Sequence, residues 1–363
     1  MSRLPRRLGR LIVLLCVLIV AAPPVAAGST SDRHAAAARE GVVVIYAATD
    51  ETVVRELERD FTQLFPGVRV EYHDLNSVEL YQRFLAEAKE GGRADVLWSS
   101  AMDLQLKLVN DGHAQPHRSA ETATLPDWAV WRDEAFGTTF EPIAMVYNRR
   151  LMAADEVPGS HAELLRLLAR TPDRYRNRLT AYDPARSGIG LLLQTQDVVA
   201  NPVVFWRLAE AFGRIGIQTV ASTAEMLDQV ASGKALLGYN VLGSYALTRA
   251  TQDPRLGVVF PRDYTLVISR VAFISRQARH PNAARLWLDY LLSPRGQQLL
   301  SKKPGFYSVR AEVPADEAAE DLRQRLGLAF RPIVIGTNLL AYLDQMKRRD
   351  FLRQWHETIA PLP

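Results

Sequence analysis

The sequence predicts an α/β protein of two lobes that are joined by two extended segments, with a cleft between the lobes. Apolar strand patterns alternate with amphipathic helix patterns over residues 41–100, and the same alternation returns after residue 175. Two long apolar segments, 137–148 and 256–275, provide the crossings between the two alternating regions. Alternating strands and helices with short turns form a mostly parallel sheet covered by helices, and two crossings return the C-terminal part to the first lobe.

The first lobe contains three predicted strands, each followed by a turn or a helix pattern. Residues 41–47 (GVVVIYA) form an unbroken apolar, β-branched run, which is typical of a strand buried on both faces. Thr49 and Asp50 then provide a helix cap, and apolar residues recur at helical spacing after them. The second strand covers residues 68–75, and the third covers residues 94–100 (ADVLWSS).

The second lobe repeats this alternation. A strand pattern ends near Pro184, the turn ARSGIG follows it, and LLLQTQDVV continues as a helix. The segment KALLGYNVLGSYAL is the next passage from strand to helix, and the apolar pattern after residue 338 predicts a C-terminal helix that packs on lobe 1. We divide the chain into residues 41–141 plus 264–363 (lobe 1), residues 142–263 (lobe 2) and the small, polar residues 28–40 (a flexible tether).

The N-terminus has the pattern of a signal peptide over residues 1–27. Four arginines without an acid precede an apolar run of about a dozen residues, and small residues follow at the expected cleavage site, Ala27. The apolar run is shorter than the roughly 20 residues that a transmembrane helix needs, although an uncleaved anchor is the alternative interpretation. We therefore expect an exported protein that resides in the periplasm.

Charge and cysteine content exclude several classes of protein. The full chain has 44 Lys and Arg against 40 Asp and Glu, and cleavage removes four arginines and no acid, which leaves 40 of each. A neutral mature chain provides no positive field for nucleic acid or for a membrane surface. The only cysteine, Cys16, leaves with the signal peptide. We expect a monomer of about 330 residues without a cofactor, stabilised by its hydrophobic cores.

The sequence lacks the motifs of the common hydrolases. Neither G-x-S-x-G nor H-E-x-x-H is present, and His356-Glu357 has no second histidine in register. Asp50 and Asp183 could form an acid/base pair, but each also caps a turn. We expect a binding protein and not an enzyme.

Candidate ligand-binding residues gather where predicted strands end. Ligands of open α/β sheets bind beyond the carboxyl ends of the strands, where helix N-termini favour an anion. The candidates are Thr49, Asp50, Ser99, Ser100, Ser187, Gly188, Tyr239, Asn240, Ser244, Tyr245 and Arg270.

Several of these residues have a second interpretation that is purely structural. Thr49, Asp50 and Ser100 could serve only as caps of their own helices. Arg270 stands among apolar residues, so it requires an anionic partner, which is either the ligand or an internal carboxylate such as Glu141. Arg186, in the turn before Ser187, has the position of a solvated turn residue.

Four stretches of the chain resemble the bacterial extracellular solute-binding proteins of ABC transporters, in the branch of ferric-ion, thiamine and phosphonate binders. They are FTQLFPGVRVEY, ADVLWSS, MVYNRRLM and, as the most specific, RHPNAARLWLDYLLSPRGQQLL at residues 279–300. The resemblance extends over residues 41–310. It implies the type II periplasmic binding protein fold, in which two hinged lobes close around a small ligand and deliver it to a membrane permease.

The resemblance also bears on the ligand. Ferric-ion binders of this family carry adjacent metal-ligating tyrosines in the segment that reads GYNVLGSYA here, and often a histidine after the first strand. In this sequence Tyr239 and Tyr245 are separated, and Asp50 stands in place of the histidine. Hydroxyls and exposed amides suit a phosphorylated or carboxylated organic anion better. Two alternatives stay open: a ferric-ion binder, and a sensing protein that docks on a histidine kinase, as the similarity to phosphoglycerate-transport regulatory proteins implies.

Overall fold

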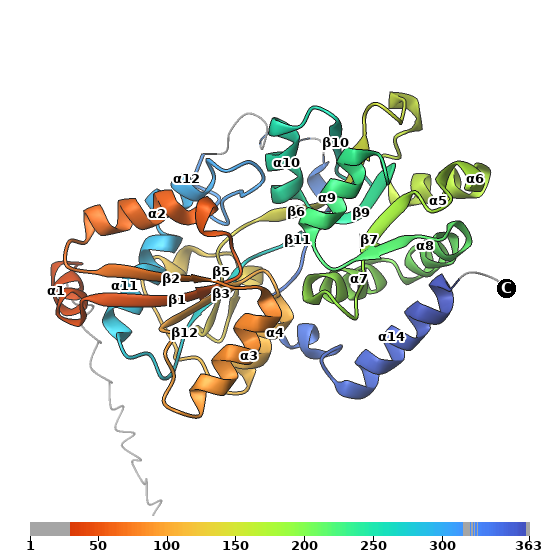
Figure 1. The fold of residues 1–363 in the computed structure, drawn as a ribbon. Helices are drawn as coiled ribbons and strands as arrows, with labels where there is room; N and C mark the ends of the chain where they lie inside the picture. Colours follow the sequence, from red (N-terminus) through yellow and green to blue (C-terminus); the bar gives the residue numbers. More distant parts are fainter. Residues whose placement is uncertain (1–29, 315–319, 321, 323, 325, 361–363) are drawn as a thin grey trace, which may run out of the picture.

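The computed structural model describes residues 30–314, 320, 322, 324 and 326–360. These residues form two α/β lobes that lie side by side (Figure 1). The signal peptide predicted for residues 1–27 lies outside the described residues. Among the helices of the described part, none combines the length and the apolar character that a membrane span requires.

The sheet of lobe 1 has the strand order β2-β1-β3-β12-β5-β4, in which β1, β2 and β3 run parallel. Its strands are β1 (Val42–Ala47), β2 (Arg69–Asp74), β3 (Val96–Ser99), β4 (Val130–Trp131), β5 (Ala135–Gly137) and β12 (Val271–Ile274). Its helices are α1 (Thr30–Glu40), α2 (Glu51–Leu64), α3 (Ser77–Ala88), α4 (Met102–Asn110), α11 (Pro281–Leu292) and α12 (Pro294–Leu300). The buried, mostly β-branched residues of β1 contribute to the apolar clusters on both faces of this sheet.

The sheet of lobe 2 has the order β13-β11-β6-β9-β7-β8, with β10 paired to β6. Its strands are β6 (Glu141–Asn148), β7 (Leu179–Tyr182), β8 (Gln218–Val220), β9 (Leu237–Leu242), β10 (Leu256–Val259), β11 (Thr265–Ile268) and β13 (Phe330–Pro332). Its helices are α5 (His161–Arg170), α6 (Pro172–Tyr175), α7 (Gly188–Ala200), α8 (Pro202–Ile215), α9 (Thr223–Ser232), α10 (Gly243–Gln252) and α14 (Gln345–Ile359).

The chain crosses between the two sheets twice, within the segments 137–148 and 256–275. The lobe boundary expected between residues 263 and 264 is wrong, because β11 (Thr265–Ile268) belongs to the sheet of lobe 2. The chain leaves lobe 1 after β5 and enters lobe 2 with β6, and it returns between β11 and β12. The two crossings, residues 138–140 and 269–270, lie next to each other because Ile268 pairs with Glu141. We call this region the hinge.

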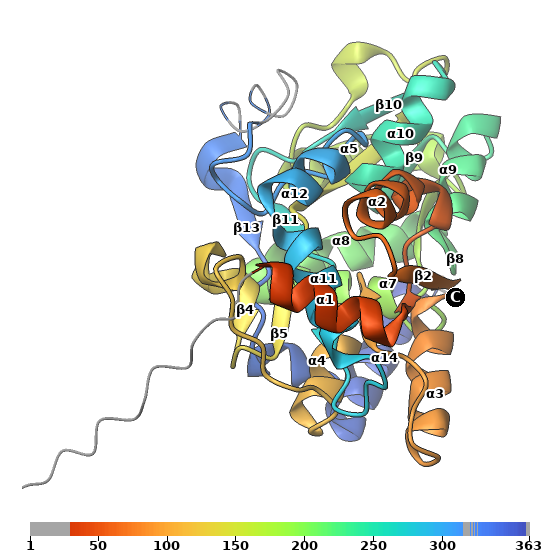
Figure 2. The same cartoon turned by 90° about the vertical axis from the view of Figure 1, so that its left-hand side faces the viewer.

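The expected flexible tether at residues 28–40 is wrong from Thr30 onward, because these residues form helix α1. Figure 2 shows α1 lying across α11. The Glu40 carboxylate accepts hydrogen bonds from the backbone N–H groups of Asn282 (2.9 Å) and Ala283 (2.8 Å) at the start of α11. The four consecutive alanines favour a helix, and a carboxylate at a helix N-terminus is stabilised by its free N–H groups and its dipole.

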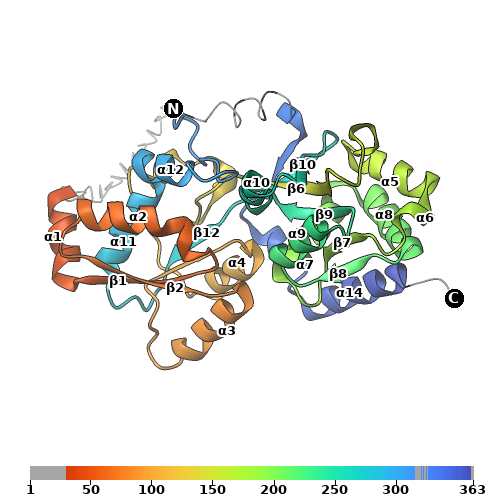
Figure 3. The same ribbon diagram turned by 45° about the horizontal axis from the view of Figure 1, so that its top comes forward.

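The C-terminal assignment to lobe 1 is also wrong in two places. Strand β13 adds to β11 in the sheet of lobe 2, and α14 packs on α8 of the same lobe (Figure 3). Phe351 and Trp355 of α14 stack against Phe205 of α8. The short 3-10 turn Thr337–Leu340 reaches back to lobe 1, where it contacts α4. The helix begins after its cap Asp344, so the apolar residues before it belong to that turn.

Candidate ligand-binding cleft

The first edge of the cleft is the carboxyl end of the parallel strands β1, β2 and β3. Ala47 pairs with both Asp74 and Trp98, so these three strands end at the same level. Asp50 follows β1, and Ser99 and Ser100 end β3. Helices α2, α3 and α4 all begin at this edge, so their N-terminal N–H groups point toward it.

The second edge is the carboxyl end of β7 and β9 in lobe 2. These strands are parallel neighbours, so the helices that follow them, α7 and α10, begin at the same edge of the sheet. Ser187 caps α7 by accepting a hydrogen bond from the Gly190 N–H group (3.2 Å). Ser244 and Tyr245 lie in the first turn of α10.

The two edges meet at both ends of the cleft. At one end the Tyr245 hydroxyl donates a hydrogen bond to Asp50 of the opposite lobe (3.1 Å). At the other end Gly188 lies so close to lobe 1 that a Cβ atom there would be 3.8 Å from Leu104 and 3.9 Å from Val78. The candidates from the ends of β1, β3 and β7 and from the start of α10 therefore lie at two edges that face each other, and we take the space between these edges as the candidate cleft.

Hydroxyl groups and free amides gather at the Gly188 end. The hydroxyls of Ser99 and Ser77 lie 3.2 Å apart, and Ser77 is the first residue of α3. Ser100 is buried, and its hydroxyl has no hydrogen-bond partner among the described residues. Arg186, next to Ser187, is exposed and forms no ion pair with any described residue. This end of the cleft thus offers donors from three helix N-termini, and the turn before α7 carries an exposed arginine.

The Tyr245 end of the cleft is acidic. Asp74 accepts a hydrogen bond from the Glu51 N–H group (3.1 Å), and Asp50 and Glu51 lie at the start of α2. Partial burial, and then the charges of Asp50 and Glu51, raise the pKa of Asp74 above its usual value. A cation or a hydroxyl donor is favoured there, so the two ends of the cleft differ in the chemistry that they accept.

Arg270 does not face the cleft, because its side chain is fully buried in the hinge. Its Nε and Nη2 atoms donate to Glu141 (2.9 and 3.3 Å), and Nη1 donates to the Ala48 carbonyl and the Thr49 hydroxyl (2.8 Å each). Burial alone would lower the pKa of Arg270, but the adjacent Glu141 carboxylate outweighs it and raises this pKa. The internal ion pair with Glu141, the alternative noted from the sequence, is the arrangement that the structure has.

Two further candidates belong to the same buried group. The Ser244 hydroxyl donates to Glu141 (2.6 Å), and the Thr49 hydroxyl accepts a hydrogen bond from Arg270. The Thr139 hydroxyl also donates to Glu141 (2.7 Å). We call these five residues, Arg270, Glu141, Thr139, Thr49 and Ser244, the hinge network. Each is completely buried, so Thr49, Ser244 and Arg270 are placed away from any ligand.

Tyr239 and Asn240 also lie away from the cleft, inside lobe 2. The Tyr239 hydroxyl (2.9 Å) and the Asn240 amide (2.5 Å) both donate to Asp197 of α7, and Tyr264 donates to its other oxygen (3.1 Å). Burial raises the pKa of Asp197, although these three donors and the nearby His161 oppose the rise. Asp197 was not among the residues expected from the sequence, because it lies within an apolar helix, 42 residues from Tyr239.

Comparison with known proteins agrees with this geometry. The family model of the bacterial extracellular solute-binding proteins matches residues 45–298, which is most of the chain. The chain belongs to this family. A substrate-binding protein of an ABC transporter from Agrobacterium tumefaciens is 34% identical, with a TM-score of 0.81 over 88% of this chain and 94% of the other. The solute-binding protein described here is therefore of the ABC-transporter type, with the two-lobed type II fold.

Two more distant relatives are informative. Iron-bound HitA from Pseudomonas aeruginosa is 16% identical, with a TM-score of 0.71 over 87% of this chain and 99% of that chain, which supports the fold alone. The phosphoglycerate transport regulatory protein PgtC of Salmonella typhimurium is 28% identical over 191 residues. That match covers 51% of this chain, which spans only 44% of the length of PgtC.

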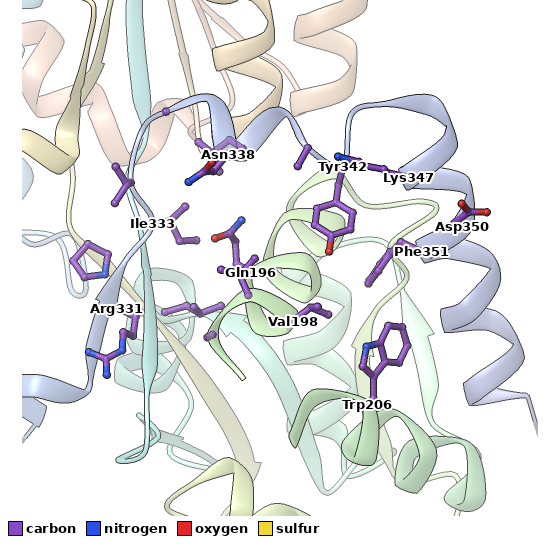
Figure 4. Close-up of a pocket in the computed structure, with 18 of the residues that line it drawn as sticks. Gln196, Val198, Trp206, Arg331, Ile333, Asn338, Tyr342, Lys347, Asp350 and Phe351 are labelled. Atoms are coloured by element: carbon purple, nitrogen blue, oxygen red, sulfur yellow. The ribbon is translucent and has the colours of Figure 1, made fainter. Parts of the chain in front are cut away.

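A cavity of about 910 Å³ lies outside the cleft of this solute-binding protein, between the C-terminal segment and lobe 2 (Figure 4). Gln196 of α7 lies in its middle, and Trp206, Tyr342 and Phe351 line one side. The cleft and not this cavity is the candidate site, because the free hydroxyls and helix N-termini of both lobes are found there. Within the described ranges, no three His, Cys, Asp or Glu side chains are placed to hold a metal ion together.

Proposed function

We propose that this solute-binding protein captures a small organic anion, phosphorylated or carboxylated, in the interlobe cleft and delivers it to an ABC-transporter permease. One observation carries the proposal: hydroxyls and helix N-termini of both lobes come together where α7 approaches α3 and α4, and the exposed Arg186 lies in the turn before α7. The residues concerned are Ser77, Ser99 and Ser100 on lobe 1 and Ser187 and Gly188 on lobe 2.

The physical chemistry of this end of the cleft favours a negative group. Helix N-termini carry partial positive charge, and a hydrogen bond to a charged group contributes about 1.5–3 kcal/mol. A ligand that contacts both lobes binds the closed arrangement better than the open one, so it shifts the population toward closure. The acidic end, with Asp50 and Asp74, favours a ligand that also carries a hydroxyl or an amino group.

Ferric iron is the second candidate, and the contact between Tyr245 and Asp50 supports it. A phenol and a carboxylate that meet across the cleft are both oxygen ligands for a hard cation. Burial raises the pKa of Tyr245, so its phenol is neutral unless a metal displaces the proton.

A sensing role is the alternative to delivery. PgtC is named as a regulatory protein of phosphoglycerate transport, and a loaded solute-binding protein could equally dock on a membrane histidine kinase. Delivery and sensing use the same closure of the lobes and differ only in the docking partner.

The test is a thermal-shift screen of protein that has been unfolded and refolded to remove bound ligand. The panel contains 3-phosphoglycerate, phosphonates, di- and tricarboxylates, thiamine and ferric citrate. A ligand at 100 times its Kd stabilises by about 2.7 kcal/mol, which is a shift of a few degrees. We expect a shift with an organic anion that Arg186→Gln reduces. A shift with ferric citrate alone, together with a phenolate-to-iron absorption band that Tyr245→Phe removes, would establish the second candidate instead.

A further inference from the structure

The hinge network connects lobe 1, lobe 2 and the hinge through residues that are far apart in the sequence. Glu141 begins β6, and Arg270 lies in the returning crossing, so the ion pair joins the two strands of the hinge. Thr139 belongs to the outgoing crossing itself, and its hydroxyl also accepts a hydrogen bond from the Arg270 N–H group (2.9 Å). The core of the network is therefore internal to the hinge.

Three hydrogen bonds extend this core into the lobes. On the side of lobe 1, Arg270 donates to the Ala48 carbonyl and to the Thr49 hydroxyl, just after β1 (2.8 Å each). On the side of lobe 2, Ser244 in the first turn of α10 donates to Glu141 (2.6 Å). All four side chains are completely buried, so water does not compete for these bonds.

The two lobe residues of the network directly precede two residues of the cleft. Asp50 follows Thr49, and Tyr245 follows Ser244, and these two following residues hydrogen-bond to each other (3.1 Å). The Arg270 guanidinium also lies over the Tyr245 ring, 5.8 Å from its centre. The hinge network and the Asp50–Tyr245 contact thus form a closed ring of contacts at the Tyr245 end of the cleft.

We propose that Glu141 and Arg270 are positioning residues of the ligand site, which act through Thr49 and Ser244 to set the distance between Asp50 and Tyr245. An apolar pair of similar volume would be as stable as this buried ion pair, or more stable. Apolar contacts lack direction, however, whereas Arg270 and Glu141 hold one residue of each lobe at a defined distance and angle. The proposal rests on the cleft being the ligand site, but the positions of the lobes can be measured without any ligand.

The experiment compares three variants that each remove a hydroxyl from the hinge network. Ser244→Ala removes the hydrogen bond to lobe 2, and Thr49→Val removes one of the two hydrogen bonds to lobe 1, since the Ala48 carbonyl still accepts from Arg270. Both variants leave the ion pair in place. Thr139→Val is the matched control, because it removes two hydrogen bonds of the same ion pair without disconnecting a lobe. If Thr49→Val and Ser244→Ala acted only by lowering the stability of the protein, Thr139→Val would therefore have an effect at least as large.

The first measurement is the interlobe distance by electron paramagnetic resonance in the absence of ligand. The chain has one cysteine, so the full chain with Cys16→Ala accepts spin labels at two chosen positions. Arg59→Cys on α2 and Gln252→Cys on α10 are exposed and lie on the helices that carry Asp50 and Tyr245. We expect a narrow distance distribution in the reference and in Thr139→Val, and a broader or shifted one in Thr49→Val and Ser244→Ala. Unchanged distributions in Thr49→Val and Ser244→Ala, or an equal change in Thr139→Val, would overturn the proposal.

The second measurement is the affinity for 3-phosphoglycerate as the probe. Thr49→Val and Ser244→Ala should weaken binding about tenfold, the factor that corresponds to about 1.4 kcal/mol, whereas Thr139→Val should stay within about twofold. If the reference protein does not bind this probe, the phosphoglycerate class fails, and the distance measurement still decides the positioning role.

Discussion

The two halves of one segment, 239–240 and 244–245, have the same kinds of side chain and different roles. Tyr239 and Asn240 lie within β9 and bind Asp197 inside lobe 2. Ser244 and Tyr245 follow the strand end, where Ser244 binds Glu141 at the hinge and Tyr245 binds Asp50 of lobe 1. Side chains within a strand of this sheet are covered by the helices of its own lobe, and the first turn after the strand faces the other lobe. A few residues along the chain therefore separate a core role from an interlobe role.

Removal of the Arg270 side chain is expected to have the largest effect on stability. Arg270 forms the ion pair with Glu141, which is the hydrogen-bond partner of Ser244 in the hinge. Arg270→Ala leaves Glu141 buried without its counter-charge, and breaking a buried pair in this way costs about 3–5 kcal/mol. Equilibrium unfolding in urea at pH 7.5 measures this loss. Glu141→Met combined with Arg270→Met is the control and should be closer to the reference than Arg270→Ala is. If the double variant were the less stable of the two, the ion pair would be a net source of stability.

Asp103 of α4 is a second buried acid, and it has fewer hydrogen-bond partners than Asp197, the partner of Tyr239 and Asn240. Its carboxylate accepts the Leu104 N–H group (2.9 Å), and burial raises the pKa of Asp103 to about 6, against the weaker effects of local N–H groups and Arg348. A raised folded-state pKa means that the protonated form is favoured on folding. The contribution to stability is therefore complete below pH 4 and is lost as the pH rises through about 6.

Asp103→Asn removes this titration. The variant should be more stable than the reference by about 3 kcal/mol at pH 8, and the difference should largely vanish at pH 4. Thermal unfolding across this range measures it. Asp111→Asn, the same chemical change at an exposed acid at the end of the same helix, is the control. An equal gain for Asp103→Asn at both pH values would contradict the shifted pKa.

The lobes and the cleft edges could be predicted from the sequence, because their signals are local. The first strand was expected at 41–47 and is observed at Val42–Ala47. The cap after it was expected at Asp50, which takes the N-cap position of α2 but makes no capping hydrogen bond with its side chain. A buried strand, a turn and a cap are each encoded within a few neighbouring residues. The same information was sufficient to place Ser99, Ser100, Ser187 and Gly188 at the edges that face each other.

The partners of buried polar residues could not be predicted in this way. Arg270 and Glu141 are 129 residues apart, so the sequence allowed either the ligand or Glu141 as the partner. Helix α14 was assigned to the wrong lobe because its apolar stripe would fit either one, and only the aromatic stack on Phe205 decides between them. Long-range partners depend on how the lobes assemble, which no short window of sequence contains.

Tyr239→Phe tests the core half of the segment. The substitution removes one of the three donors to the buried Asp197 carboxylate, so we expect a loss of about 1–3 kcal/mol in the free energy of unfolding. The affinity for any ligand found in the screen should stay within about twofold, because Tyr239 lies inside lobe 2. Titration calorimetry on the folded variant measures this affinity. A large loss of affinity at unchanged stability would move Tyr239 into the cleft.

Tyr245→Phe tests the interlobe half and should have the smallest effect on stability. Its partner Asp50 is exposed, so water replaces the lost hydrogen bond, and the free energy of unfolding should change by no more than about 0.5 kcal/mol. Ligand affinity should instead fall, because the substitution alters one wall of the cleft and removes the direct hydrogen bond between the lobes there. The pair Tyr239→Phe and Tyr245→Phe makes the same chemical change six residues apart. A loss of stability in the first and of affinity in the second would show that the strand end separates the two roles.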